Sequence, residues 1–351
     1  MNQTRITASR KNSPLGRFLA LFTGLFLLIF HSSPSLSAPI TLEGNGGWVD
    51  GHGRTSPPTL TGKVVLYDFW DYTCINCIRT FPHLNAIYQK YKNKGLIIVG
   101  IHSPEFDFAA SPERVARAIA QYHIDFPVVL DKDRRLWDRF KNHYWPSDYL
   151  YSPTGTLLYH SIGEGGYDEL DNSIVTALHL SSPSSTENSD STSFSPDLTP
   201  ELYAGTERGH LGNPSGYHLN DYNYIGHSVI NNSIILKGNW SSTPDHVFSG
   251  KLIQGTAPSL TVYYQGRGVN AVMRRPRHQV AGTVMVLVDG HPLNMNEAGT
   301  DTTITPPSQS VLQVNRSRMY SIVSQQTYGA HRLDLIFETP GTSLYTLTFN
   351  P

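Results

Sequence analysis

Cysteine is scarce in this sequence, since the 351 residues contain only Cys74 and Cys77. Any disulfide chemistry of the chain therefore belongs to this one pair. An excess of charge of one sign is also lacking, because 27 basic residues stand against 28 acidic ones. Nucleic acid is not expected as a partner, since binding to phosphate backbones needs a basic surface.

Long hydrophobic runs are missing from most of the chain. The apolar run near the start, residues 18–30, follows four basic residues and precedes small and polar residues up to Ala38. This order is typical of an export signal, and the run is shorter than the about 20 residues that span a bilayer. We expect residues 1–38 to be a cleaved signal peptide, with a retained N-terminal anchor as the alternative. The protein would then lie in the periplasm or on the outer face of the cell membrane.

Composition divides the rest of the chain into two parts. Residues 181–196 are rich in serine and poor in apolar residues, which is typical of a flexible linker. We therefore expect one domain over residues 39–180 and a second over residues 197–351. A hydrophobic content of 39% is that of folded rather than disordered chains.

Segments typical of strands and helices alternate between about residues 63 and 178. Residues 39–62, which precede them, are rich in Gly, Pro and Thr and are expected to hold at most short strands. The order predicts an α/β fold in which helices cover a compact sheet. The predicted strands are 63–70, 96–101, 126–130, 149–151 and 156–161, and the predicted helices run from the cysteines to Gly95, from Ser111 onward, over 134–140 and over 166–178.

Helical periodicity disappears after the serine-rich segment. Runs rich in β-forming residues, separated by turn residues, occupy 228–236, 260–264, 283–288 and 333–337. This pattern predicts an all-β second domain, an antiparallel sandwich of jelly-roll-like type.

Cys74 and Cys77 are separated by two residues, follow a predicted buried strand and open a predicted helix. Free N–H groups and the positive end of the helix dipole favour a thiolate on Cys74 at this position. Cys77, one turn further in, is expected to be the shielded thiol that resolves a mixed disulfide. A structural disulfide would close too small a loop to stabilise the fold much, and a zinc site would need a second pair of ligands. We favour a redox-active disulfide without a metal or another cofactor.

The run from Lys63 to Pro82 resembles the active-site strand and helix of thioredoxins. Residues 62–178 are similar to the TlpA-like branch, in particular to the extracytoplasmic part of DipZ-type proteins. The resemblance implies a thioredoxin fold, thiol-disulfide oxidoreductase activity, and protein thiols or disulfides as partners. Ile75-Asn76 replaces the Gly-Pro of thioredoxin, so the direction of electron flow stays open, and we expect a reductant.

The resemblance also suggests roles for residues around the disulfide. Asp68 matches the buried thioredoxin aspartate, and Glu105 matches an acid that TlpA-like reductases hold near the disulfide. We expect both to move protons, with a solvated or backbone-capping carboxylate as the alternative. Pro146 falls where the fold has its cis-proline and is expected to present backbone to the substrate. Substrate contacts are expected from Trp145, Trp70 and Thr73.

Residues 197–351 resemble the carbohydrate-binding-module-like sandwich of DipZ-type chains. The resemblance depends on three short sequence motifs, namely Leu198–Glu201 with Tyr203, Leu236–Trp240 and Leu344–Phe349. Trp240, Tyr263 and Tyr264 are candidates for stacking on a glycan, with core packing as the commoner explanation. The membrane domain of DipZ-type proteins is not among these residues, so the resemblance implies a separate membrane electron donor.

Two other functions stay open at this stage. An accessible Cys74 thiolate can react with peroxide, which would make the protein a thiol peroxidase. Alternatively, the sandwich binds a glycan or an envelope partner and the thioredoxin-like part only supports it.

Overall fold

Strand β3 (Val64–Trp70) forms the centre of the first sheet. All seven of its residues are buried, as expected for an apolar run rich in β-formers. β4 (Leu96–His102) pairs with it in parallel, and β6 (Ser147–Tyr151) pairs antiparallel on its other side. The computed structural model describes residues 42, 46–181, 197–227 and 230–351, and there the predicted α/β order is confirmed.

The first sheet has seven strands in the order β2-β1-β5-β4-β3-β6-β7. Its other members are β1 (Trp48–Asp50), β2 (Gly53–Thr55), β5 (Val128–Leu130) and β7 (Leu157–Ile162). The glycine-rich lead-in supplies β1 and β2, and β1 pairs antiparallel with β5. The lead-in is therefore part of the sheet, through two strands of three residues each.

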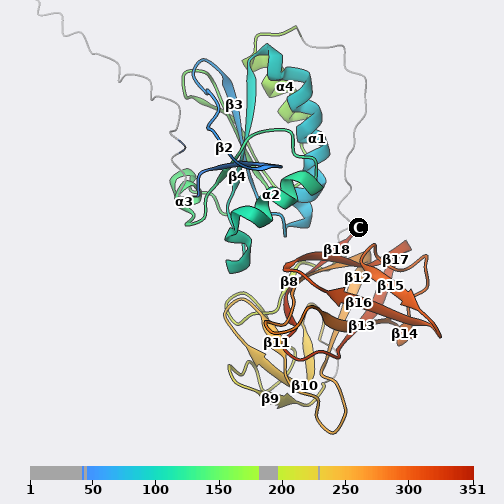
Figure 1. Ribbon diagram of the computed structural model, residues 1–351. Helices are drawn as coiled ribbons and strands as arrows, with labels where there is room; N and C mark the ends of the chain where they lie inside the picture. Colours follow the sequence, from blue (N-terminus) through green and yellow to red (C-terminus); the bar gives the residue numbers. More distant parts are fainter. Residues whose placement is uncertain (1–41, 43–45, 182–196, 228–229) are drawn as a thin grey trace, which may run out of the picture. The chain divides into compact units, whose positions relative to one another are not determined.

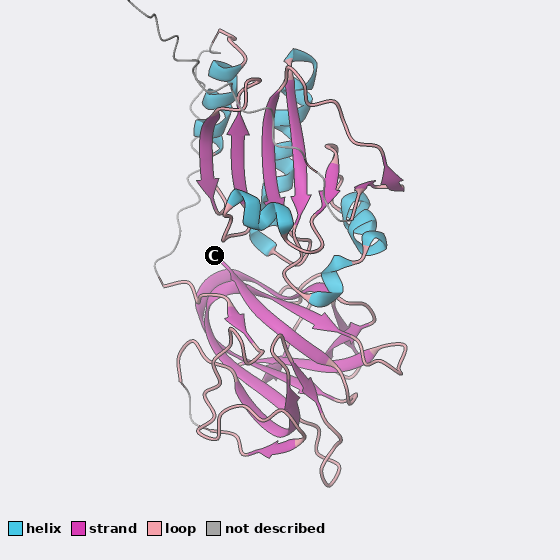
Figure 2. Cartoon of the chain, turned by 90° about the vertical axis from the view of Figure 1, so that its left-hand side faces the viewer, coloured by secondary structure: helices cyan, strands magenta, loops and turns pink. Residues whose placement is uncertain are grey.

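Helices cover both faces of this sheet (Figures 1 and 2). They are α1 (Ile75–Tyr91), α2 (Pro112–Gln121), α3 (Arg135–Phe140) and α4 (Tyr167–Ala177), with short 3-10 turns η1 (Lys92–Lys94) and η2 (Asp107–Ala110). Apolar side chains of α1, α2 and α4 share one core cluster, while those of α3 belong to the cluster on the opposite face. Gly95, with φ of 111°, ends the helical segment before β4, where a left-handed backbone favours glycine.

The second sheet has eleven strands, all paired antiparallel. They are β8 (Leu202–Tyr203), β9 (Tyr222–Tyr224), β10 (Ile235–Ser242), β11 (Val247–Ser249), β12 (Ser259–Arg274), β13 (Gly282–Val288), β14 (His291–Pro292), β15 (Thr302–Thr305), β16 (Gln309–Val314), β17 (Arg318–Phe337) and β18 (Ser343–Asn350). The predicted strand over 228–236 is wrong for residues 230–233, because β10 begins only at Ile235 and is preceded by an isolated bridge between Ile234 and Leu211. The other three predicted runs lie within β12, β13 and β17.

Strand β12 changes its partner along its length. Its first residues pair with β10 and its last residues pair with β18. Because β10 also pairs with β11, and β11 with β18, the four strands form a closed circuit. A register shift between Gly266 and Gly268 lies where the partner changes. This arrangement, with one continuous apolar core, fits the predicted β-sandwich.

The sandwich core contains two of the aromatic residues that were candidates for sugar stacking. Trp240 is fully buried and packs edge-on against Phe337, and Tyr264 is also buried. Neither ring can lie against a sugar in this structure, so the glycan hypothesis is wrong for these two residues. Tyr263 is half-buried, and glycan binding stays a prediction that depends on it alone.

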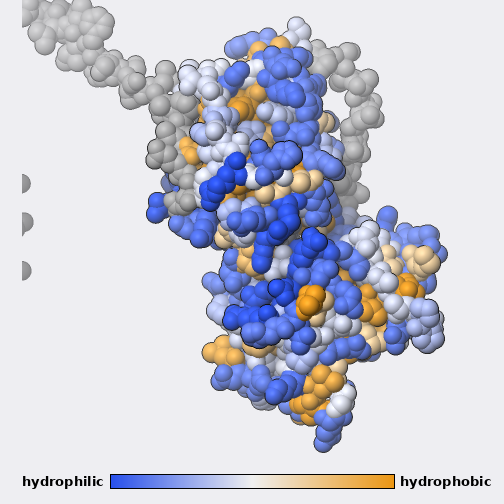
Figure 3. Space-filling view, in the orientation of Figure 1, coloured by the Kyte–Doolittle hydropathy of each residue, from blue (hydrophilic) through white to orange (hydrophobic). Residues whose placement is uncertain are grey.

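The predicted export segment 1–38 and residues 182–196 of the predicted linker lie outside the described residues. Within the described ranges, none of the helices is both long and apolar enough to cross a bilayer. Both sheets belong to one compact unit. On the face shown in Figure 3, apolar residues form scattered spots rather than one large patch.

Candidate active site

The disulfide between Cys74 and Cys77 lies at the start of α1, shortly after β3 ends. Cys74 is the N-cap residue and is half-buried, whereas Cys77 is completely buried. The backbone N–H of Cys77 donates to Sγ of Cys74 at 3.2 Å. The pair therefore has one accessible and one shielded sulfur.

The N-cap position gives Cys74 its electrostatic surroundings. The first N–H groups of a helix have no partner within the helix, and they point toward the N-cap side chain. The first turn of α1 contains no acidic residue that would oppose a negative sulfur. When the disulfide is open, this end of α1 therefore stabilises a thiolate on Cys74.

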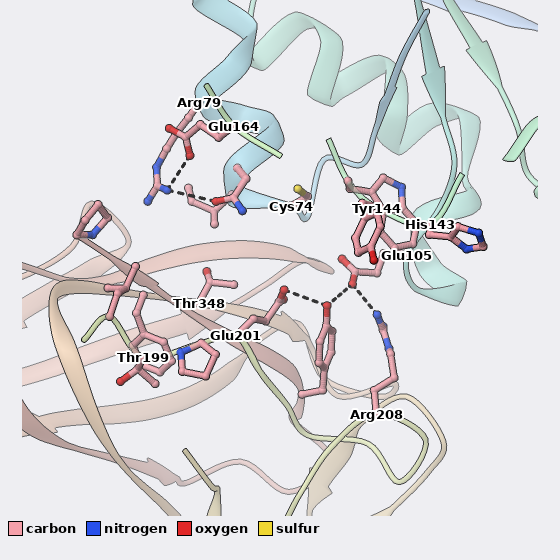
Figure 4. A pocket seen from close by; sticks show the side chains of 18 residues that line it. Cys74, Arg79, Glu105, His143, Tyr144, Glu164, Thr199, Glu201, Arg208 and Thr348 are labelled. Carbon is pink, nitrogen blue, oxygen red and sulfur yellow. Dashed lines mark hydrogen bonds and ion pairs between the residues drawn. The ribbon is translucent and has the colours of Figure 1, made fainter. Parts of the chain in front are cut away.

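A cavity of about 740 Å³ lies beside Cys74 (Figure 4). One wall comes from the α/β part of the chain and includes Glu105 and Trp145. The facing wall comes from the sandwich and includes Tyr203 and Phe349. A substrate that reaches the accessible sulfur therefore contacts both parts of the chain.

Glu105 is enclosed at the edge of this cavity. Its side chain is only 4% exposed, and its Oε1 accepts from Nη1 of Arg208 at 2.8 Å and from Oη of Tyr203 at 2.9 Å. Burial raises the pKa of Glu105, while the Arg208 charge opposes the rise. The alternative of a solvated loop carboxylate is therefore wrong for Glu105.

Tyr203 links Glu105 to a second acid of the sandwich, Glu201. The Tyr203 Oη is 2.9 Å from Oε2 of Glu201, whose Oε1 accepts from Oγ1 of Thr346 at 2.9 Å. Glu201 borders the cavity and is exposed to solvent there. Nearby protein atoms, and then the Glu105 charge, raise the pKa of Glu201 to about 8, and its exposure to solvent limits the effect.

Asp71 connects the disulfide to Glu105 and is fully buried. Its carboxylate accepts from the backbone N–H of Thr73 at 2.7 Å, from the Thr73 hydroxyl at 2.8 Å and from the N–H of Glu105 at 2.7 Å. Its carbonyl oxygen accepts from the N–H of Cys74 at 3.2 Å. Burial raises the pKa of Asp71, and these hydrogen bonds oppose the rise. Asp71 thereby fixes the backbone on which Cys74 and Glu105 stand.

Asp68 is fully buried, and neither of its carboxylate oxygens has a hydrogen-bond partner. It lies directly opposite Asp148 in the pairing of β3 with β6. Burial, and then the charge of Asp148, raise the pKa of Asp68 well above its ordinary value. Burial also raises the pKa of Asp148 to about 7. The predicted desolvation of Asp68 is therefore present, and Asp148 adds to its effect.

The Trp145–Pro146 peptide bond is cis, as predicted. Trp145 borders the cavity, and its Nε1 donates to the carbonyl oxygen of Ser103 at 3.0 Å. Its ring packs against Trp137 with centroids 4.2 Å apart. Pro146 itself is buried behind this residue. Trp145 is therefore held in one orientation at the cavity wall.

Two of the predicted substrate contacts are wrong. Trp70 is completely buried, with its ring edge-on to Phe81 and His102, so it is a core residue. Thr73 is 1% exposed and its hydroxyl is occupied by Asp71. Both side chains belong to the protein interior, and neither lines the cavity.

Sequence reasoning missed five residues of this site: Asp71, Asp148, Glu201, Tyr203 and Arg208. The position of Asp71, between an apolar strand and Cys74, was an available signal. Tyr203 and Arg208 carried none, because they lie 98 and 103 residues from Glu105 in the chain. Within the part of the chain that the structure describes, no group of three or more His, Cys, Asp or Glu side chains is arranged to hold a metal ion.

Comparison with known proteins agrees with this geometry. A family model described as thioredoxin-like matches residues 62–155, which contain the disulfide. A second model, described as a thioredoxin like C-terminal domain, matches residues 199–350. The chain therefore contains a thioredoxin-like domain, followed by a domain of the kind found C-terminal to such domains. The recognised resemblance is therefore confirmed for both halves of the chain.

This chain has relatives of similar sequence. It is 34% identical to Protein DipZ of Mycobacterium tuberculosis over 276 residues, which are 75% of this chain and 38% of the relative. It is 29% identical to the thiol-disulfide oxidoreductase YkuV of Bacillus subtilis over 137 residues, 39% of this chain and 91% of YkuV. A solved thioredoxin-like protein in the oxidized form has 27% identity and a TM-score of 0.36, covering 41% of this chain and 97% of that one.

The chain spans 38% of the length of the DipZ relatives that it matches. The match therefore concerns one part of those proteins. YkuV, by contrast, is matched over nearly its whole length by the thioredoxin-like part of this protein. YkuV is named as a thiol-disulfide oxidoreductase, and so is ResA of Bacillus thuringiensis, to which the chain is 31% identical over 112 residues, 32% of this chain and 62% of ResA.

Proposed function

We propose that this protein is an extracytoplasmic thiol-disulfide oxidoreductase that reduces protein disulfides. The observation that carries the proposal is the cysteine pair itself. Cys74 is accessible beside a cavity and stands at a helix N-terminus, while Cys77 is buried in the same helical turn. An accessible attacking sulfur and a shielded resolving sulfur are what disulfide exchange requires.

The proposed cycle begins with the reduced pair. The Cys74 thiolate attacks a substrate disulfide, forms a mixed disulfide and releases one substrate thiolate, which takes up a proton. Cys77 then loses its proton and attacks Sγ of Cys74, which releases the second substrate thiolate, and this thiolate also takes up a proton. The pair ends as the disulfide seen in the structure, and the substrate has gained two electrons and two protons. No cofactor is needed, because the pair supplies both electrons.

Four residues are proposed to serve this cycle. Asp68, which is desolvated, accepts the proton of Cys77. Glu105, at the cavity edge, exchanges protons with the substrate side. Trp145 offers its ring to the substrate, and Pro146 holds the backbone that pairs with an extended substrate segment.

The electrons are proposed to come from a separate membrane donor. Each turnover leaves Cys74 and Cys77 oxidised, and the chain has no other cysteine to reduce them. The predicted export signal over residues 1–38 supports a site outside the cytoplasm, where such a donor faces the protein.

A redox titration of the protein without residues 1–38, against glutathione and dithiothreitol, tests the proposal. Because no other cysteine is present, thiol labelling reports on this pair alone. We expect a potential near or below the about −270 mV of thioredoxin. A potential near the about −120 mV of DsbA would make the protein an oxidant. A pair that dithiothreitol cannot reduce in the folded protein would reject oxidoreductase function.

A further inference from the structure

We propose that the sandwich supplies the redox site with a proton chain that runs from Glu201 through Tyr203 to Glu105. The inference rests on the proposed function and adds to it. Glu105 borders the same cavity as Cys74, whereas Tyr203 and Glu201 belong to the C-terminal part of the chain (Figure 4). The second domain would then take part in the chemistry in addition to shaping the cavity.

The geometry requires a proton on one of the two carboxyl groups. The Tyr203 Oη is 2.9 Å from Glu105 Oε1 and 2.9 Å from Glu201 Oε2. A phenol hydroxyl has a single proton, so it can donate to only one of these oxygens. The other contact is a hydrogen bond only if that carboxyl group is protonated and donates to Tyr203.

The surroundings decide which group holds this proton. Glu105 has the Arg208 guanidinium at 2.8 Å, which favours its ionised form, although the buried Asp71 carboxylate opposes this. Glu201 has a hydroxyl, from Thr346, as its other hydrogen-bond partner, and its acidic neighbour Glu105 disfavours a second charge. Burial raises the pKa of Glu105 as well, so the order depends on the Arg208 guanidinium, which contacts Glu105 directly. Glu201 therefore donates to Tyr203, and Tyr203 donates to Glu105.

Two short proton transfers then protonate Glu105. The O–H bond of Tyr203 breaks as its proton moves to Glu105 Oε1, and the Glu201 proton moves to Tyr203 Oη. Tyr203 ends unchanged, Glu105 becomes neutral and Glu201 becomes ionised, so total charge is conserved. The proton on Glu105 goes to a substrate thiolate as it leaves Cys74 in the cavity. Glu201 later regains a proton from water that reaches it through the cavity.

Arg208 and Asp71 are positioning residues for this chain. Arg208 holds Glu105 Oε1 and also stacks over the Tyr203 ring, with its guanidinium carbon 3.9 Å from the ring centroid. Asp71 holds the N–H of Glu105 and the N–H of Cys74. These contacts fix Glu105, the last group of the proton chain, beside the disulfide.

The test uses two variants that keep shape but prevent transfer. Tyr203→Phe removes the hydroxyl and keeps the ring under Arg208. Glu201→Gln is an isostere of neutral Glu201 that can donate to Tyr203 but has no proton to give up. Tyr222→Phe, on the exposed strand β9, is the matched control. For each, the rate of reduction of a disulfide peptide is measured from pH 5 to pH 9, alongside iodoacetamide labelling of reduced Cys74.

We expect each variant to lose about tenfold or more in exchange rate near pH 7, less than the about 100-fold or more of a group that transfers a proton directly to the reacting atoms. Because Tyr203 and Glu201 act in the same proton chain, the double variant should react no more slowly than the slower of the two single variants. Labelling of Cys74 in Glu201→Gln should keep the wild-type profile below pH 7, since its charge there is unchanged. Additive losses, or single variants with the wild-type rate and pH profile, would overturn the proton chain.

Failure of the proposed function is a distinct outcome. If the wild-type protein has no exchange activity that depends on Cys74, the oxidoreductase proposal fails. The pH profiles of Cys74 labelling still test the proton chain in that case. Removal of the Tyr203 hydroxyl leaves Glu105 without this hydrogen-bond donor. We expect this change to shift the pH at which Cys74 reacts with iodoacetamide. An unshifted profile in Tyr203→Phe would then reject the chain.

Discussion

Asp68 and Asp148 face each other across β3 and β6, and both carboxylate oxygens of Asp68 lack a hydrogen-bond partner. Asp148 is half-buried, but its Oδ1 is sealed from solvent and is also without a partner. Two neighbouring carboxylates in such surroundings do not both ionise at low cost. At least one of them therefore keeps its proton until the pH is close to neutral, which suits a group that exchanges protons with Cys77.

This pair predicts a pH dependence of stability. Its pKa values are raised on folding, so its stabilising contribution is complete below about pH 4 and is lost as the pH rises through about 7. Asp148→Asn should reduce this loss, because the burial of Asp68 remains, and raise the free energy of unfolding at pH 8 by about 1–3 kcal/mol. Guanidinium unfolding of the oxidised protein at pH 4 and pH 8 measures the effect, with Asp50→Asn on β1 as the control. An equal pH slope in Asp148→Asn and wild type would contradict it.

Replacing Cys77 should trap the reaction halfway. Cys77→Ser keeps the attacking sulfur at the helix N-cap and removes the buried resolving sulfur, so a mixed disulfide with the substrate accumulates. Mass spectrometry after incubation with a disulfide peptide would show the adduct on Cys74. Cys74→Ser is the partner variant and should form little or no adduct, because Cys77 is completely buried. Adduct formation of equal extent in both variants would mean that the sulfurs are not distinguished by access.

Removal of Arg208 should destabilise the protein through Glu105. Arg208→Ala leaves a nearly buried carboxylate without its cation and uncovers the ring of Tyr203. Because the arginine is itself 36% exposed, we expect a loss of about 1–2 kcal/mol in the free energy of unfolding, below the 3–5 kcal/mol of fully buried pairs. Lys90→Ala, which breaks the more exposed pair with Asp171, is the control and should cost less than about 1 kcal/mol. Equal losses in the two variants would indicate that the burial of Glu105 does not increase the contribution of its ion pair to the free energy of unfolding.

Tyr345 should couple the unfolding of the two parts of the chain. It is a fully buried residue of β18, yet its ring packs edge-on against Phe106 and Phe108 of the α/β part, at centroid distances of 5.0 and 4.9 Å. Tyr345→Ala is expected to cost about 3–5 kcal/mol and to split one unfolding transition into two. Tyr345→Phe keeps the ring and should change stability by less than about 1 kcal/mol. Calorimetry of both variants makes the comparison, and a single unchanged transition in Tyr345→Ala would contradict the coupling.

Short-range sequence patterns were sufficient to predict the part of the fold around the disulfide. Strand β3, helix α1 and the unequal access of Cys74 and Cys77 follow from short stretches with strong hydrophobic patterns and a helix start. Substrate contact by Trp70 and Thr73 was a wrong prediction, because closeness in sequence to Cys74 says nothing about which side of the strand end a side chain occupies. The Glu105 contacts to Tyr203 and Arg208 were out of reach, since they depend on how residues about a hundred positions apart meet in space.

Strand β18 has a consequence for access to Cys74. It lies between β8 and β11 and also pairs with the end of β12, and its Thr348 and Phe349 form part of the cavity wall beside Cys74. The cysteine pair and α1 depend on residues close together in the sequence, whereas this wall depends on strands that are far apart in it. A change that unpairs β18 would therefore open the cavity beside Cys74 without altering the cysteine pair itself.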